Sequence, residues 1–334
     1  MRSVPKILAA IATALLLCAP QVRADCQGMN LLDLMPAAER KALEAAADAV
    51  PFPRGNFWRA EKGDARLVLI GTYHLNDPRH AAAVARFAPD IAAAKTLLVE
   101  AGPDEEKALL QHMGRDPSLM TITEGPTLMQ LLPPETWEKL AAAGTARGLP
   151  PFMMNKFRPW YVTVVLAIPP CAMAAMADPN GLDQQLIDSA LAAGVPVRAL
   201  EPYDTIFSIF GVMSEQDQLA MIEQTLALED SITDFSETLA DAYFDGDSRL
   251  TWELMRHLSY QVPGYTREQV DAEMAVLEEA LMNSRNRAWI PVIEEVAADG
   301  PAVVAFGALH LPGQEGVLNL LQQEGWTITP LDVQ

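Results

Sequence analysis

Cysteine and positive charge are both scarce in this sequence of 334 residues. It has three cysteines and no Cys-x-x-Cys pair, which excludes a zinc finger and a thioredoxin-like redox site. Lys and Arg total 24 against 44 Asp and Glu, a formal net charge of -20. A face that attracts nucleic-acid phosphates or anionic lipid is therefore not expected, and a solvated acidic surface is.

Long apolar runs are also lacking, apart from one at the N-terminus. Residues 7–19 are apolar, follow Arg2 and Lys6, and are too short for a membrane span. Val22-Arg23-Ala24 then offers small residues at the -3 and -1 positions of a signal peptidase site. We predict a signal peptide over 1–24, with an uncleaved anchor as the alternative. The mature chain would be periplasmic or secreted, with no membrane span.

Signal cleavage would leave two cysteines, Cys26 and Cys171. Exported proteins occupy compartments that permit disulfides, and two cysteines allow one bridge within the chain. We predict that this bridge ties the mature N-terminus to the middle of the chain. Two separate buried thiols are the alternative.

Residues 25–334 are predicted to form a single α/β domain. Half of the sequence is hydrophobic, which is enough for a sizeable core. The first predicted strand, helix and strand form a βαβ unit, which implies a parallel pair with a right-handed crossover. The stretch from about 104 to 280 is mostly helical and is predicted to be an insertion between the two α/β ends. The predicted strands are 65–71, 96–100, 195–200, 302–307 and 326–330, and the main predicted helices are 36–50, 80–94, 183–193 and 313–324.

A weak internal repeat links the two ends of the chain. Gly71-Thr-Tyr-His74 and Gly307-Ala-Leu-His310 each follow an apolar strand. Each His would lie just beyond the carboxyl end of its strand, where open α/β sheets place ligands. The repeat predicts a duplicated core with two Gly-x-x-His units at one site. The alternative is that both His cap helices or fill loops. The other three His lack this setting and are interpreted as ordinary surface or packing residues.

A carboxylate is predicted at the same edge of the sheet. Glu100 ends the strand 96–100, so its side chain should project toward His74. Two imidazoles and one carboxylate are a common ligand set for a catalytic divalent metal with an open position for water. His74, His310 and Glu100 are therefore candidate ligands for a metal of the Mn, Co or Zn class. An exposed loop acid or a helix cap is the alternative for Glu100.

At these residues the chain resembles the TraB/GumN family, which is related to the TIKI proteases and more distantly to the ChaN and erythromycin-esterase group. The resemblance implies a duplicated α/β core whose two Gly-x-x-His motifs meet at one site. The TIKI members are metal-dependent peptidases that need both His motifs and the Glu, which here are His74, His310 and Glu100. The matching pieces, in order, are Gly71-Thr72-Tyr73-His74, Val99-Glu100, Arg158-Pro159-Trp160, Gly181-Leu182-Asp183, Leu200-Glu201, Arg285-Asn286 and Gly307-Ala308-Leu309-His310-Leu311-Pro312-Gly313.

Two segments depart from the family pattern. Arg158 stands where the family often has Lys, and the segment 202–206 differs from the residues that commonly follow Leu-Glu.

Metal-assisted hydrolysis also needs a cation to hold the developing oxyanion, and Arg158 is the candidate, with a surface salt bridge as its alternative. Asp183 and Glu201 are candidates for orienting the imidazoles, with helix capping and loop solvation as the alternative.

The remaining candidates surround the predicted site. Arg285 and Asn286 open a helix and are interpreted as a network that links the insertion to the sheet. Tyr73 lies beside His74 and is placed in the surroundings of the metal. Methionines near the insertion, such as Met153 and Met173, are interpreted as core packing rather than as a flexible peptide surface.

The leading functional hypothesis is an exported metal-dependent hydrolase, a peptidase by preference, that acts on a peptide or small-molecule substrate. A second hypothesis is a non-catalytic envelope protein that binds haem, a small ligand or a peptide signal. Haem needs an axial side chain such as His or Tyr73 in an apolar cleft, and the sequence has no haem-specific motif. A structural partner in envelope assembly is the third hypothesis. The sequence does not indicate an oligomeric state.

Overall fold

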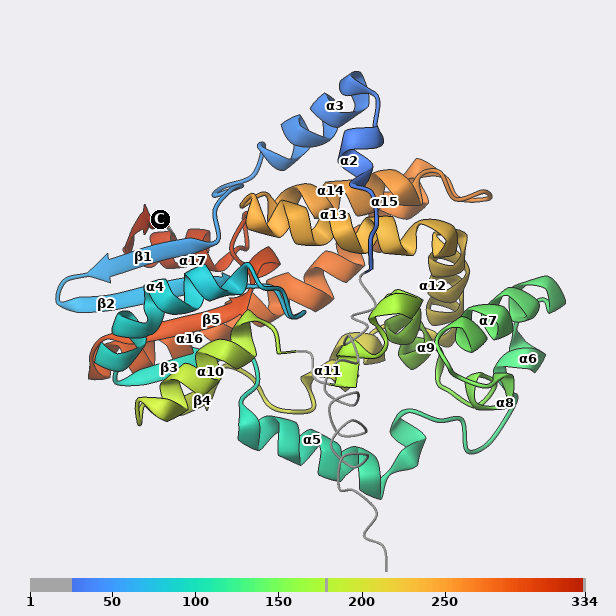
Figure 1. The fold of residues 1–334 in the computed structure, drawn as a ribbon, viewed down its shortest axis with the longest axis horizontal. Helices are drawn as coiled ribbons and strands as arrows, with labels where there is room; N and C mark the ends of the chain where they lie inside the picture. Colours follow the sequence, from blue (N-terminus) through green and yellow to red (C-terminus); the bar gives the residue numbers. More distant parts are fainter. Residues whose placement is uncertain (1–25, 178–179, 333–334) are drawn as a thin grey trace, which may run out of the picture.

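A computed structural model of the chain describes residues 26–177 and 180–332, so the predicted signal peptide lies outside the described residues. Six strands form one sheet in the order β4-β3-β5-β2-β1-β6 (Figure 1). The predicted α/β class is confirmed, and each of the five predicted strands is present within two residues of its expected ends. The strands are β1 (Phe57–Lys62), β2 (Ala65–Thr72), β3 (Thr96–Val99), β4 (Val197–Ala199), β5 (Ala302–Gly307) and β6 (Thr327–Pro330).

The four strands β4, β3, β5 and β2 are parallel, and β1 is antiparallel to both of its neighbours. The predicted βαβ unit is therefore present, but its two strands are not adjacent, because β5 from the other end of the chain lies between them. The side chains of β5 are buried at five of its six positions, as expected for a strand in the centre of a sheet covered on both faces. The two strand-Gly-x-x-His units are thus direct neighbours, with Gly71 paired to Phe306 and Thr72 to Gly307.

Strand β1 was not predicted. Its sequence, FWRAEK, is half charged or polar, and only Trp58 and Ala60 are buried. A two-residue turn at Gly63-Asp64 joins it to β2, and Gly63 has a φ of +61° there. Gly-Asp between two strands is typical of a hairpin turn, so the sequence indicated the turn. The polar composition of β1 did not indicate a strand before it.

One face of the sheet is covered by α16 (Ser284–Asp299) and α17 (Val317–Gln323). Trp289, Ile293 and Val296 lie on one side of α16 at helical spacing, and they pack on the sheet with Phe306 and other strand residues. The predicted helix 313–324 begins later than expected, because the segment before Val317 is a turn in which Gly313 has a φ of +112°.

The other face is covered by α4 (His80–Ala93) and α10 (Leu182–Ala192), both close to their predicted bounds. Ala83, Phe87 and Ile91 recur every four residues along α4 and pack against the strands. The result is three layers, helix, sheet and helix, with apolar side chains filling both interfaces.

The stretch between Glu100 and α16 is mostly helical, as predicted. It returns to the sheet at α10 and β4, and the helices within 128–166 and at 215–227 form the end of the molecule away from the sheet (Figure 1). No helix in the described part of the chain is both long and apolar enough to cross a membrane. The N-terminal segment adds α2 (Leu31–Leu34) and α3 (Ala37–Ala47). The helices of the insertion are α5 (Pro103–Arg115), α6 (Leu128–Leu131), α7 (Pro134–Ala146), α8 (Pro151–Met154), α9 (Pro159–Leu166), α11 (Thr205–Gly211), α12 (Glu215–Ala227), α13 (Ile232–Phe244), α14 (Ser248–Ser259) and α15 (Arg267–Glu278).

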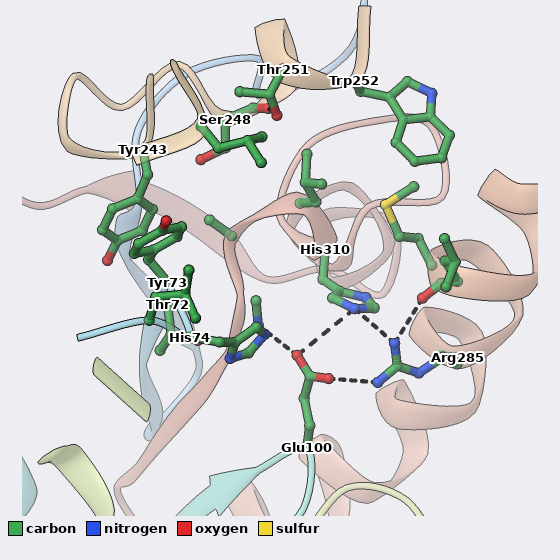
Figure 2. A pocket seen from close by; sticks show the side chains of 17 residues that line it. Thr72, Tyr73, His74, Glu100, Tyr243, Ser248, Thr251, Trp252, Arg285 and His310 are labelled. Atoms are coloured by element: carbon green, nitrogen blue, oxygen red, sulfur yellow. Dashed lines mark hydrogen bonds and ion pairs between the residues drawn. The ribbon is translucent and has the colours of Figure 1, made fainter. Parts of the chain in front are cut away.

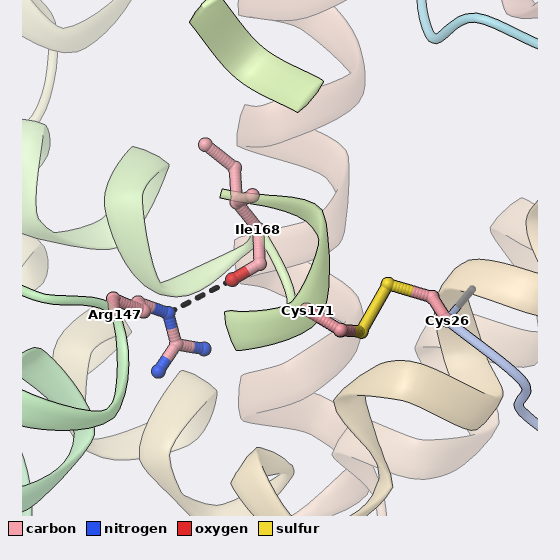
Figure 3. Close-up of a disulfide and its surroundings, with 4 residues drawn as sticks. All are labelled: Cys26, Arg147, Ile168 and Cys171. Atoms are coloured by element: carbon pink, nitrogen blue, oxygen red, sulfur yellow. Dashed lines mark hydrogen bonds between the residues drawn. A yellow bond between two sulfur atoms is a disulfide. The ribbon is translucent and has the colours of Figure 1, made fainter. Parts of the chain in front are cut away.

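The predicted disulfide is present between Cys26 and Cys171, with their Cα atoms 5.5 Å apart (Figure 3). It joins the first described residue to the insertion, across 145 positions of sequence. Arg147 anchors the segment that precedes Cys171. Its fully buried guanidinium donates to the carbonyl of Ile168 at 2.8 Å and pairs with Glu229.

Loss of this bridge is expected to destabilise the fold by about 2–4 kcal/mol, because the cross-link closes a long loop and restricts the unfolded chain. The Cys26→Ser/Cys171→Ser variant should unfold at lower denaturant concentration than the wild type. Intact-mass analysis without reductant should show two hydrogens fewer than the dithiol form. Quantitative thiol labelling of both cysteines in the untreated protein would contradict the bridge.

Candidate functional site

A cavity of about 400 Å³ lies where β2, β3 and β5 end. His74, Glu100 and His310 line it, each just beyond the carboxyl end of one of these strands (Figure 2). Arg285 reaches it from the start of α16. Three residues that the sequence separates by up to 236 positions therefore share one space.

The glycines of the two motifs permit this convergence. A Cβ atom placed at Gly307 would lie 3.1 Å from His74 Nε2, 3.3 Å from Glu100 Oε1 and 3.7 Å from His310 Cδ2. His74 Nε2 and His310 Cδ2 both lie within 3.7 Å of this one position, so the two rings face each other across Gly307. A Cβ atom at Gly71 would lie 2.6 Å from Leu311, which follows the second motif. Each glycine therefore leaves room for the other half of the repeat.

Glu100 is held by donors on both oxygens. Its Oε1 accepts from the backbone N–H of Gly307 at 2.6 Å and its Oε2 accepts from Arg285 Nη2 at 2.6 Å. Burial alone would raise the pKa of Glu100, but the charges of His310, His74 and Arg285, with the Gly307 amide, lower it to about 2. The pKa of His310 itself is low, so His74, Arg285 and the amide account for the effect near pH 7.

His310 is a neutral imidazole whose tautomer the hydrogen bonds define. Asn286 Nδ2 donates to the carbonyl of Glu315 at 2.8 Å, so Asn286 Oδ1 is the acceptor that faces His310 Nδ1 at 2.6 Å. His310 Nδ1 therefore carries the proton and Nε2 carries the lone pair, which accepts from Arg285 Nη1 at 3.2 Å. Burial lowers the pKa of His310 to about 3, with the charge of Glu100 opposing this shift and those of Arg285 and His74 adding to it.

His74 differs from His310 in exposure and charge. Its side chain is 58% exposed, and its Nδ1 lies 3.2 Å from Asp183 Oδ1. Desolvation of the ring lowers its pKa, but the hydrogen bond to Asp183 and the charge of Glu100 outweigh this and raise the pKa to about 9. Water at the exposed ring edge partly screens both carboxylates.

Arg285 connects the cluster, and all five of its N–H groups have acceptors. Two bonds of 2.7 and 2.8 Å go to Glu201, and the others go to Glu100, to His310 and to the carbonyl of Leu281. A π-helical turn, Glu279–Asn283, immediately precedes α16 and presents the Leu281 carbonyl to Arg285. Such turns are frequent at functional sites.

The structure brings most of the other candidates to the cluster, with changed contacts. Asp183 holds His74 and Asn286 holds His310, whereas Glu201 contacts Arg285 and no imidazole. Tyr73 lines the cavity with its ring stacked on that of Tyr243.

Arg158 is not part of this cluster. It is exposed at the start of α9, where its Nε donates to the carbonyl of Ser118 at 2.5 Å, and it lines a different cavity. Arg285 is the cation that contacts Glu100 and His310. Sequence reasoning placed Arg285 in a structural network, because a basic residue opening a helix gives no sign of the distant carboxylates that surround it.

Trp289 on α16 is a core residue that also contacts the cluster. Its ring packs against His310 with centroids 4.4 Å apart, and its Nε1 donates to Glu201 at 3.1 Å. Trp289 is four residues after Arg285 on α16, and residues four apart share a helix face, so this spacing indicates that Trp289 lies on the side of the helix that faces the cluster.

No three His, Cys, Asp or Glu side chains stand together at metal-ligand spacing within residues 26–177 and 180–332. In the arrangement described, Arg285 contacts two of the three candidate ligands, Glu100 and His310. His310 Nε2 is 3.9 Å from Glu100 Oε1.

The environment of Glu100 predicts acid sensitivity. Its pKa is lowered to about 2 from an ordinary value of 4.5, so the stability that it contributes is complete above about pH 4.5 and is lost as the pH falls from there toward 2. Glu100→Gln should flatten the decline of the melting temperature in this window. The exposed Glu106→Gln is the control, and superimposable profiles for all three proteins would contradict the prediction.

Comparison with known proteins places these residues in a recognised sequence family. The model of the TraB/PrgY/gumN family matches residues 56–330, a range that contains every residue of the cluster. No curated protein and no solved structure matches the chain.

Proposed function

Because the chain belongs to the TraB/PrgY/gumN family, we propose that the protein is an exported hydrolase that cleaves an amide or ester bond, in a peptide by preference. The observation that carries the proposal is the meeting of two imidazoles, a carboxylate and a guanidinium in one cavity at the sheet edge. Open α/β sheets bind their ligands at this edge. Export is part of the proposal and rests on the predicted signal peptide, with support from the disulfide.

The donor chemistry of the cluster fits a divalent metal of the Mn, Co or Zn class. The Nδ1 atoms of His74 and His310 face oxygen atoms of Asp183 and Asn286, as the outer nitrogens of metal-binding imidazoles do. Each oxygen of Glu100 accepts one hydrogen bond and retains capacity for another partner. His74, Glu100 and His310 would hold the ion.

The charge balance supports the same proposal. Glu100, Glu201 and Asp183 carry three negative charges and Arg285 supplies one positive charge, so a net charge of -2 remains once His74 gives up its proton to become a ligand, since His310 is already neutral. A divalent cation matches this remainder. When bound, such an ion polarises a carbonyl group and lowers the pKa of a water molecule.

The protein's own groups have separable roles in this scheme. Asp183 and Asn286 fix the orientation of the two rings. Glu100 lines the cavity and serves either as a ligand of the ion or as the group that takes a proton from the attacking water. Arg285 has no N–H left for a substrate, so it positions Glu100 and His310 and contributes positive potential where negative charge develops.

Non-catalytic binding in the same cavity is the second candidate, because most of the side chains around the cavity are apolar. Haem fits the site less well than a small apolar ligand. The Tyr73 ring is stacked on Tyr243, so Tyr73 is not presented as a free axial ligand.

The test uses the mature protein after chelator treatment. Calorimetric titration with Mn²⁺, Co²⁺ and Zn²⁺ should show one site in the wild type, at least about tenfold weaker binding in His310→Ala, and unchanged binding in His257→Gln. His257 lies on α14 outside the cavity and contacts Glu39. Cleavage of a peptide library should accompany metal binding. Absence of both, together with a co-purified ligand or a Soret band, would replace the enzyme proposal with the binding one.

A further inference from the structure

The cavity has two chemically different sides. Glu100, Arg285 and His310 form one side, and the residues from α13 and α14 lie across from them (Figure 2). Apolar side chains make up most of the lining away from the charged groups. They are Leu75, Leu239, Leu281, Met282 and Leu309, with the ring of Tyr243. An apolar space of this size is within the range of sites that bind small organic groups.

Three Ser or Thr hydroxyl groups interrupt this apolar lining, and that of Thr251 donates to the carbonyl of Ser248 at 2.7 Å. Thr72 at the end of β2 and Ser248 at the start of α14 both line the cavity and are 3% and 8% exposed. Neither Thr72 Oγ1 nor Ser248 Oγ makes a hydrogen bond to any part of the chain that the structure describes. Buried hydroxyl groups normally have a partner, and a rotation about χ1 that turns either hydroxyl toward the cavity gives it one in a bound molecule.

The apolar lining is structurally joined to the reacting groups. The π-helical turn Glu279–Asn283 carries Leu281 and Met282 into the cavity, and Arg285 follows two residues after it. On the other side, Leu309 immediately precedes His310 in the second motif. A group bound against these leucines is therefore held next to Glu100 and the imidazoles.

We propose that this cavity is a specificity pocket for a large apolar side chain, aliphatic or aromatic, beside the bond that is cleaved. The inference rests on the proposed hydrolase function and names its substrate class, a peptide or amide with such a residue. Ser248, and Thr72 beside the reacting centre, hydrogen-bond the polar amide groups that flank this side chain. Burial of a Leu or Phe side chain favours binding over Gly by about ten- to a hundredfold. A carboxylate side chain is disfavoured, since the apolar side of the cavity carries no cation and Glu100 repels it from the other side.

Binding is tested separately from catalysis. Ligand-observed NMR on the wild-type protein compares N-acetyl-leucinamide and N-acetyl-phenylalaninamide with N-acetylglycinamide and N-acetyl-aspartic acid amide. The two apolar amides should bind about tenfold or more tightly than the other two. Equal binding of all four, or tighter binding of the charged amide, would overturn the inference. This comparison needs no variant.

Variants then locate the binding. Leu239 is partly exposed on α13, so Leu239→Trp fills the cavity from its rim and should abolish the preference for apolar amides. Leu191→Trp, at a 55% exposed position on α10, is the matched control. Ser248→Ala should weaken binding of both apolar amides about three- to tenfold without changing their order. Unchanged preference in a folded Leu239→Trp protein would overturn the assignment of the pocket.

The two proposals can fail independently. Selective binding of apolar amides without hydrolysis of any peptide would retain the pocket and remove the hydrolase. Hydrolysis that depends on Glu100 but shows no preference for an apolar residue beside the cleaved bond would retain the hydrolase and remove the pocket.

Discussion

Replacing His74, His310 or Glu100 is expected to lower hydrolysis about a hundredfold or more in each case. The three side chains surround one point at Gly307, so each contributes to the same step. Once one is lost, the remaining two cannot carry out that step, and a second loss should add little. The His74→Ala/His310→Ala double variant should therefore be close to the worse single variant. Each is expected to stay folded, because strand-end residues contribute little to the apolar core.

The measurement is peptide cleavage, metal content and melting temperature for His74→Ala, His310→Ala, Glu100→Gln and the double variant. His257→Gln serves as the control and should match the wild type. Multiplicative losses in the double variant would show that the two imidazoles act in different steps. Full activity in the double variant would refute the site.

The architecture was predictable because its strands are short, apolar and bounded by Gly, Pro or charged residues. The parallel strands β2, β3 and β5 bury most of their side chains, so each reads as a continuous apolar run. The repeat of Gly-x-x-His at two strand ends then predicted that distant residues meet, which the register between β2 and β5 now shows. Strand order was not predictable, because an apolar run does not specify its neighbour.

The electrostatics of the cluster were less accessible from sequence. Arg285 and Glu201 are 84 positions apart, and nothing in either neighbourhood indicates that they pair. Arg158 was the predicted cation, yet its guanidinium donates to the carbonyl of Ser118, away from the cluster. Side-chain pairing of this kind depends on how the insertion folds back on the sheet, which local patterns do not encode.

Removing the cation of Arg285 is expected to destabilise the protein by about 3–5 kcal/mol, because Arg285→Met leaves the mostly buried carboxylates of Glu100 and Glu201 without their partner. Arg285→Lys should fall between Met and the wild type, since an ammonium has three donors where the guanidinium uses five. Arg198→Met is the matched control. The pair of Arg198 with Glu295 is exposed, so its loss should change stability little.

Two further readouts separate lost charge from lost packing. Adding Glu201→Gln to Arg285→Met removes one unpaired carboxylate and should recover part of the stability, whereas a packing defect would be unchanged or worsened.

Without the guanidinium, burial raises the folded-state pKa of both carboxylates, and that of Glu201 is already above its ordinary value. Protonation then relieves the repulsion, so the deficit of Arg285→Met relative to the wild type should shrink as the pH falls from 7 toward 5. Urea unfolding at both pH values measures this. A deficit no larger than that of Arg198→Met, or one that grows as the pH falls, would show that Arg285 is not the charge that holds these two acids at the cavity.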